Sequence, residues 1–144
     1  MNLKQVKQYL REIQRLDALI RCKTAEIVQL RELALSITVQ SSSEPVMTSK
    51  NPDKIGTVVA KIVDLQDEAA MEIDRFLDVR QERIAVIEKV ADVKHYDILH
   101  QRYVQYRSLK QISIEMKLPY DSVKTLHLEA LRSVESILGD KKAL

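Results

Sequence analysis

The side chains best suited to chemistry in this chain of 144 residues lie directly after Pro119. Five polar residues follow it closely, namely Tyr120, Asp121, Ser122, Lys124 and Thr125. Their hydroxyl, carboxylate and ammonium groups donate and accept hydrogen bonds. Near the start of a helix, such groups can meet the base edges in the major groove of a DNA duplex. The spacing therefore predicts a DNA-contacting surface, which Leu128 extends by one further turn.

The other reactive side chains form no catalytic or metal-binding pattern. His95, His100 and His127 lack metal-ligand spacing, and no cysteine or carboxylate completes a set. The single cysteine, Cys22, permits neither an internal disulfide nor a zinc cluster, and we expect it to be a small apolar residue of a helix. The sequence also contains no glycine-rich phosphate loop. We therefore expect neither catalysis nor a cofactor or metal.

The apolar spacing around Pro119 predicts two helices joined by a tight turn. Ser108 and Gln111 have the spacing of a capping box at the start of the first helix. Pro119 suits the first turn of the second helix, where its missing N–H is not needed, and Leu118 is expected to fill the gap between the helices. The apolar stripes of the two helices are Leu109, Ile112 and Met116, and then Val123, Leu126, Ala130, Leu131 and Val134. This pattern is typical of a helix-turn-helix.

A further helix is expected just before this pair. Its apolar face is predicted to contain Tyr96, Leu99, Tyr103 and Val104.

Long helices precede this module, because residues that break helices are rare and clustered. The chain has only two glycines and three prolines, and neither type occurs from Met1 to Glu44 or from Thr57 to Leu118. Apolar spacing predicts helices over residues 3–37 and 54–91, joined by a serine-rich loop over residues 40–53. We expect this loop to be marked by Pro45, Pro52 and Gly56. We expect the last helix to end near Gly139. The fold class expected is all-α.

The first long helix carries a heptad repeat, which predicts a coiled-coil-like pairing. Its seam is formed by Val6, Ile13, Ile20, Ile27 and Ala34, and it is interrupted by Asp17 and Thr24. Residues 1–40 have a net charge of +3 and residues 41–91 one of −3, which favours an antiparallel hairpin. A hairpin of two helices has little core. We therefore expect a homodimer formed through residues 3–37 and 54–91.

The chain is thus divided into a hairpin over residues 1–91 for oligomerisation, a helix-turn-helix domain over residues 92–140 and a tail over residues 141–144. Its 45% hydrophobic residues exclude a disordered chain. No apolar run reaches the length of a membrane span, and no signal-peptide pattern is present. We expect a soluble protein without a membrane partner, located in the cytoplasm of a bacterial host cell.

The C-terminal module resembles region 4 of the sigma-70 family, the helix-turn-helix that reads the −35 promoter element. The resemblance covers about 45 residues, and its matching residues are Arg102, Tyr103, Ser108, Leu109, Ile112, Met116, Leu118, Val123, Leu126, Glu129, Ala130 and Leu131. The order of long helix, serine-rich loop, second helix and module is also similar to a family of small phage and prophage proteins. That family is related to the RinA and ArpU late-transcription regulators of phages that infect Gram-positive bacteria.

The sigma resemblance implies base contacts from the positions here occupied by Tyr120, Asp121, Lys124 and Thr125. It implies contacts to the DNA backbone from Arg102, Ser108 and Lys110. Tyr120 and Ser122 stand where sigma factors commonly have arginines, so the −35 preference is not transferred.

Together the resemblances imply a phage-encoded, sequence-specific DNA-binding regulator of late transcription. Its partner is double-stranded DNA, and the hairpin is a candidate surface for host RNA polymerase, as in a sigma-like adaptor.

Two other functions remain open. A small terminase-like subunit for DNA packaging would also combine a DNA-binding helical module with an oligomerising part. A helical interaction protein that does not bind DNA is favoured by the weak charge of the module, which has 9 basic and 7 acidic residues from Asp92 to Leu144.

Overall fold

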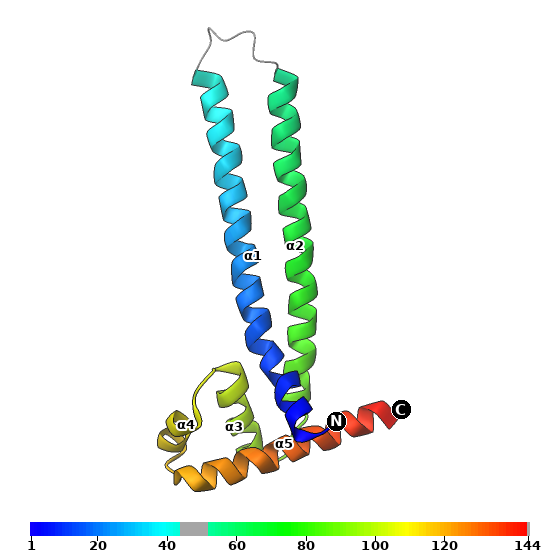
Figure 1. Ribbon diagram of the computed structural model, residues 1–144, viewed down its shortest axis with the longest axis vertical. Coiled ribbons are helices and arrows are strands. Elements are labelled where there is room, and N and C mark those ends of the chain that lie inside the picture. Colours follow the sequence, from blue (N-terminus) through cyan, green and yellow to red (C-terminus); the bar gives the residue numbers. More distant parts are fainter. Residues whose placement is uncertain (44–51, 144) are drawn as a thin grey trace. The chain divides into compact units, whose positions relative to one another are not determined.

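The computed structural model describes residues 1–43 and 52–143, and in these ranges the chain is helical and contains no strand (Figure 1). The elements are α1 (Leu3–Ser43), α2 (Pro52–Glu88), α3 (Val93–Leu99), the π-helix η1 (His100–Val104), α4 (Leu109–Met116) and α5 (Tyr120–Ala143). The expected all-α class and the pairing of two long helices are confirmed. No helix of the described ranges is long and apolar enough to span a membrane.

The ends of the long helices differ from the expected ones. α1 continues to Ser43, inside the segment expected to be a loop, and the centre of that segment, residues 44–51, lies outside the described residues. α2 begins at Pro52, a position where a helix does not need the missing N–H. Gly56 lies inside α2 and Gly139 inside α5, so neither glycine marks a helix end. Both helices are long enough to absorb the cost of about 1 kcal/mol for an internal glycine.

Contacts divide the chain into two compact units. The first unit is Met1–Asp17 with Asp78–Leu144, and the second unit is Ala18–Leu77. The boundary expected between residues 91 and 92 therefore falls inside the first unit. The reason is that the first turns of α1 and the last turns of α2 share a core with the C-terminal helices, which the heptad pattern alone does not reveal.

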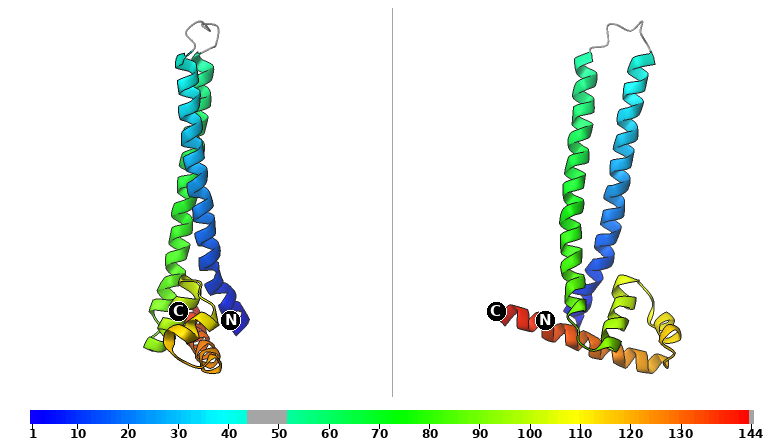
Figure 2. Two further views of the ribbon diagram at one scale, coloured as in Figure 1. Left: turned by 90° about the vertical axis from the view of Figure 1, so that its left-hand side faces the viewer. Right: turned by 180° about the vertical axis from the view of Figure 1, so that it is seen from behind.

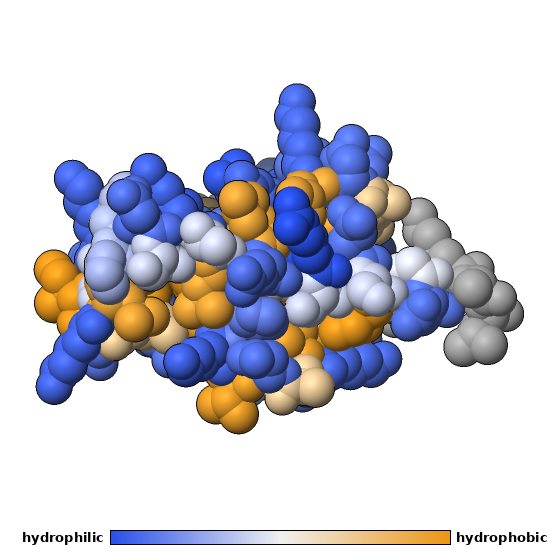
Figure 3. Space-filling view, turned by 90° about the horizontal axis from the view of Figure 1, so that it is seen from below, coloured by the Kyte–Doolittle hydropathy of each residue, from blue (hydrophilic) through white to orange (hydrophobic). Residues whose placement is uncertain are grey.

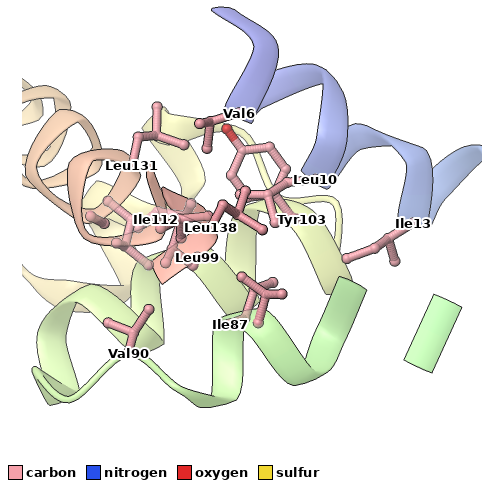
Figure 4. Packing of buried hydrophobic residues seen from close by; sticks show 14 of the residues in the cluster. Val6, Leu10, Ile13, Ile87, Val90, Leu99, Tyr103, Ile112, Leu131 and Leu138 are labelled. Atoms are coloured by element: carbon pink, nitrogen blue, oxygen red, sulfur yellow. The ribbon is translucent and has the colours of Figure 1, made fainter. Parts of the chain in front are cut away.

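The core of the first unit draws side chains from all six helical elements (Figure 4). Its buried members are Val6, Leu10, Ile13, Val86, Ile87, Val90, Ile98, Leu99, Tyr103, Ile112, Val123, Ala130, Leu131, Val134 and Leu138. A fully buried Leu or Ile contributes about 1.5–3 kcal/mol. The contributions from α1 and α2 are therefore a substantial part of what stabilises the short helices α3 and α4.

The second unit consists of antiparallel stretches of α1 and α2, which lie next to one another in Figure 1 and overlap when the view is turned by 90° (Figure 2, left). Among the described residues of this unit, the buried apolar ones are Ile62 and Ala69. Polar contacts also cross between the helices. The Lys23 ammonium lies 3.1 Å from the Glu72 carboxylate, and the Gln66 amide donates to the Ile27 carbonyl at 3.4 Å. The expected hairpin pairing is present in this unit.

The two polar residues of the heptad seam are accommodated differently. In the first unit, the Asp17 carboxylate pairs with the Arg80 guanidinium of α2, and both side chains are largely shielded from solvent. In the second unit, the Thr24 hydroxyl donates to the Ile20 carbonyl of its own helix at 2.8 Å. Since a seam carboxylate can find this partner in only one alignment of the helices, the Asp17–Arg80 pair favours a single register.

Candidate nucleic-acid interface

The helix α4 begins with the capping box that the sequence predicts. The backbone N–H of Gln111 donates to the Ser108 hydroxyl oxygen at 3.2 Å, and the backbone N–H of Ser108 donates to the Gln111 side-chain oxygen at 2.8 Å. Two N–H groups that would lack helical partners are thus satisfied. The start of α4 is fixed by its own local sequence.

A three-residue turn, Lys117–Pro119, connects α4 to α5. Lys117 ends α4 in the left-handed conformation, with φ 55° and ψ 43°. Its N–H donates to the Ile114 carbonyl at 3.3 Å, and the N–H of Leu118 donates to the Ser113 carbonyl at 3.0 Å. Pro119 lies immediately before α5, and its carbonyl accepts from the N–H of Val123 at 3.1 Å. These bonds close the turn without help from other elements.

The first turns of α5 are buried on one side and exposed on the other. Val123 is fully buried, and Leu118 and Leu126 pack against the core. All five polar residues expected at the interface are exposed, namely Tyr120, Asp121, Ser122, Lys124 and Thr125. We call these five residues the α5 polar face. The depression beside this face has a volume of about 410 Å³ and includes Lys94 and Glu129 among its lining residues.

The side chains of the α5 polar face contact one another. The Lys124 ammonium lies 4.6 Å from the centre of the Tyr120 ring and 3.9 Å from the Asp121 carboxylate. The Thr125 hydroxyl donates to the Asp121 carbonyl at 3.1 Å. Both members of the Asp121–Lys124 pair are well exposed, so their attraction is weak and a stronger anion can displace the carboxylate. Lys124 is therefore available to a phosphate or a base.

The three residues implied for the DNA backbone do not form one cluster with this face. Ser108 and Lys110 are exposed at the start of α4. Arg102 is half-buried in η1, where its Nη1 donates to the Arg107 carbonyl at 3.1 Å. Its neighbours across a small pocket are Arg11 and Gln14 of α1. The structure thus joins Arg102 to the start of the chain, which the sequence did not indicate.

A buried polar pair behind the α5 polar face was not predicted. The Tyr103 hydroxyl lies 2.8 Å from Nε2 of His127, and the two rings are stacked with their centres 5.7 Å apart. Burial, together with the nearby cations Lys7, Arg102 and Arg11, lowers the pKa of His127 to about 4. Burial also raises the pKa of Tyr103 to about 12. His127 lies four residues after Val123, so its position on the apolar face was the available signal.

The helix before α4 changes type halfway, where the sequence predicts one regular helix. After α3, η1 continues with wider turns, and the N–H of Gln105 bonds to the His100 carbonyl at 3.0 Å. The buried Gln101 is satisfied by Asp97 and Arg107, at 2.9 Å and 3.2 Å. Tyr106 then adopts a left-handed conformation with φ 61°. The local sequence does not predict this change from α-helix to π-helix.

The surface of the first unit is chemically mixed. Figure 3 shows hydrophilic side chains interspersed with separate apolar patches on the face that it presents. Ile114 and Val93 are the most exposed large apolar residues among those described, at 78% and 79%. In the described ranges no group of three histidine, cysteine or acidic residues could hold a metal ion.

Comparison with known proteins adds no further information on the site. No protein-family model, no curated protein and no solved structure matches the chain. The geometry of α4, the turn and α5 is therefore the basis for assigning a function.

Proposed function

We propose that this protein is a sequence-specific regulator of transcription that inserts the start of α5 into the major groove of double-stranded DNA. The observation that carries the proposal is the arrangement of α4, the Lys117–Pro119 turn and α5. One side of α5 is held in the core by Val123, while the α5 polar face is exposed. A recognition helix needs both properties. Its buried side must be held in place by the core, and its exposed side must present polar groups to the bases.

The chemistry of the α5 polar face suits bases as well as phosphates. A lysine can donate to the acceptors of guanine, and an aspartate can accept from the amino group of cytosine. Tyr120 offers a ring and a hydroxyl beside Lys124. Ser108 and Lys110, exposed at the start of α4, are candidates for contacts to the DNA backbone.

A second copy of the chain is the partner that we propose for the second unit. Val58 and Leu65 are exposed, at 39% and 43%, and each lies one turn before a buried residue of α2, Ile62 and Ala69 respectively. With these two exposed side chains, the apolar stripe of α2 is wider than the area that one partner helix covers. Charge also favours association, since residues 18–43 have a net charge of +1 and residues 52–77 one of −3. A copy that pairs its α1 with this α2 would join opposite charges.

The resemblance to regulators of phage late genes makes transcription the process that we assign to DNA binding. A homodimer would present two copies of α5 to one duplex. Its binding site would then be an inverted repeat whose half-sites lie about one helical turn, or a multiple of it, apart. Contact with host RNA polymerase through the hairpin belongs to the same proposal.

Selection from a library of random duplexes tests the function. We expect the full-length protein to enrich one inverted-repeat motif, because direct contacts to bases distinguish sequences by about 1–3 kcal/mol each. Lys124→Glu should weaken binding to the enriched duplex by at least tenfold. Arg75→Glu is the matched control, since it makes the same charge change at an exposed site on α2. Enrichment of no motif, or equal binding by both variants, contradicts the proposal.

A further inference from the structure

A small pocket lies between the start of α1 and η1, within the first unit. Its volume is about 100 Å³, and its lining residues are Arg11, Gln14, Arg102 and Tyr103. Arg11 and Gln14 are exposed, while Tyr103 is 4% exposed and forms part of the core. The pocket therefore has a rigid inner wall and a polar rim that solvent reaches.

The guanidinium group of Arg102 is held in a fixed position at this pocket. Its Nη1 donates to the Arg107 carbonyl at 3.1 Å. Because a guanidinium carries five N–H donors, this bond leaves others for a ligand. The Tyr103 hydroxyl is hydrogen-bonded to His127, whose lowered pKa keeps its ring neutral at pH 7. The inner wall of the pocket is therefore uncharged. An anion entering the pocket thus meets donors and no opposing carboxylate among the lining residues.

Positive charge gathers around the pocket. The charges that act on His127 behind it are all cations, namely Lys7, Arg102 and Arg11. Lys7 and Arg11 are four residues apart on α1, so they share one face of that helix. The pocket therefore brings together three cations, Lys7, Arg11 and Arg102, from distant parts of the sequence. Their charges repel one another, and a bound anion would reduce this repulsion.

The inner wall of the pocket is hydrogen-bonded to α5. The Tyr103–His127 bond joins its inner wall to α5 at a point seven residues after Tyr120. Seven helical residues span about 10 Å, which is less than the width of the major groove. In the proposed complex, the duplex must extend back along α5 by about this distance for a backbone phosphate to enter the pocket.

We propose that the pocket formed by Arg11, Gln14 and Arg102, with Lys7 beside it, binds a backbone phosphate of the duplex that α5 reads. The inference rests on the proposed DNA-binding function and adds α1 to the DNA interface. Arginine forks and glutamine amides are common donors to phosphate oxygens, and such contacts orient a protein on DNA without reading its sequence. The pocket would fix how far α5 enters the groove.

Salt dependence of binding to a labelled duplex of arbitrary sequence tests this inference. The double variant K7Q/R11Q removes the lining residue Arg11 and the neighbouring cation Lys7, and R21Q/R31Q removes two exposed cations farther along α1 as the matched control. Loss of the one phosphate contact reduces the slope of log K against log salt by about 0.9, so the wild type should lose about three- to fourfold more affinity than K7Q/R11Q between 50 and 200 mM salt. R21Q/R31Q should behave as the wild type. Helical circular dichroism verifies that each variant is folded.

The variant Lys124→Glu, measured in parallel, separates the two proposals. If Lys124→Glu weakens binding but K7Q/R11Q matches R21Q/R31Q, the phosphate pocket is wrong and the DNA-binding function stands. If the wild type does not bind the duplex at 50 mM salt, both proposals are wrong. Side-chain NMR signals of Arg11 and Arg102 give an independent readout, and they should shift when duplex is added. A shift with inorganic phosphate alone, without one on adding duplex, would mean a free-anion site and would also overturn the inference.

Discussion

At the scale of single residues, the Tyr103–His127 pair makes the stability of the first unit depend on pH. His127 has a pKa of about 4 in the folded protein, against 6.5 when unperturbed. Between these values the unfolded chain binds a proton that the folded chain does not, so stability falls as the pH falls. The loss should begin near pH 6.5 and approach about 3 kcal/mol near pH 4.

Urea unfolding at several pH values between 7.5 and 4 measures this effect. His127→Gln should remove most of the slope below pH 6.5, even if the variant is less stable at every pH. His100→Gln is the control and should retain the slope, because His100 is only half-buried and bonds to the Gln105 side chain. Equal slopes in the two variants would show that other groups cause the pH dependence.

At the scale of elements, the capping box determines where α4 begins. Ser108→Ala removes the oxygen that accepts from the N–H of Gln111, and it should lower the free energy of unfolding by about 1 kcal/mol. Ser136→Ala makes the same change at an exposed position of α5 and should alter it by less than about 0.5 kcal/mol. Thermal or urea unfolding of the two variants checks the difference. A loss no larger for Ser108→Ala than for Ser136→Ala would mean that the cap is dispensable.

The elements also show what could be predicted from the sequence. Ser108, Gln111 and Pro119 act through bonds to neighbours within four residues, so their roles were visible in the local pattern. The π-helix η1 and the left-handed Tyr106 were not visible in the local pattern, which predicted a regular helix there. The exposed α5 polar face followed from the apolar period, whereas its DNA-binding role stays a prediction.

The division into two compact units could not be predicted for a similar reason. A heptad repeat shows that Val6 and Ile13 face a partner, but it does not say which helix that partner is. In the structure these residues belong to the core that also contains Ile112 and Leu131 of the C-terminal helices. The same repeat continues into the second unit, where α2 is the partner. The heptad repeat of α1 thus packs in the core of the first unit and against α2 in the second unit.

At the scale of the whole molecule, association of two copies is the property that most affects the proposed function. Leu65→Glu places a charge on the widened apolar stripe of α2, and it should weaken the dimer at least tenfold because a charge is costly to bury. Met71→Glu is the control, since Met71 is 67% exposed and should tolerate the charge. Sedimentation velocity over a range of concentrations measures both variants.

The same measurement on the wild type distinguishes the functions that remain open. A dimer supports the regulator, whereas a ring of eight or more chains would favour a DNA-packaging subunit. A monomer at all concentrations, or equal dimerisation by Leu65→Glu and Met71→Glu, would contradict the proposed interface. A duplex bound by a monomer would then require a single half-site rather than an inverted repeat.

The core shared by the start of α1 and the end of α5 has a consequence for folding during synthesis. Val6 and Val134 belong to one cluster although 128 positions separate them in the sequence. At usual rates of translation, α5 follows α1 from the ribosome after on the order of ten seconds. The antiparallel second unit can form within that interval, because its contacts need only residues already made. Until α5 has been synthesised, the apolar side chains of Val6, Leu10 and Ile13 stay exposed to solvent. A ribosome stalled before that point would therefore leave a nascent chain that chaperones bind at its first helix.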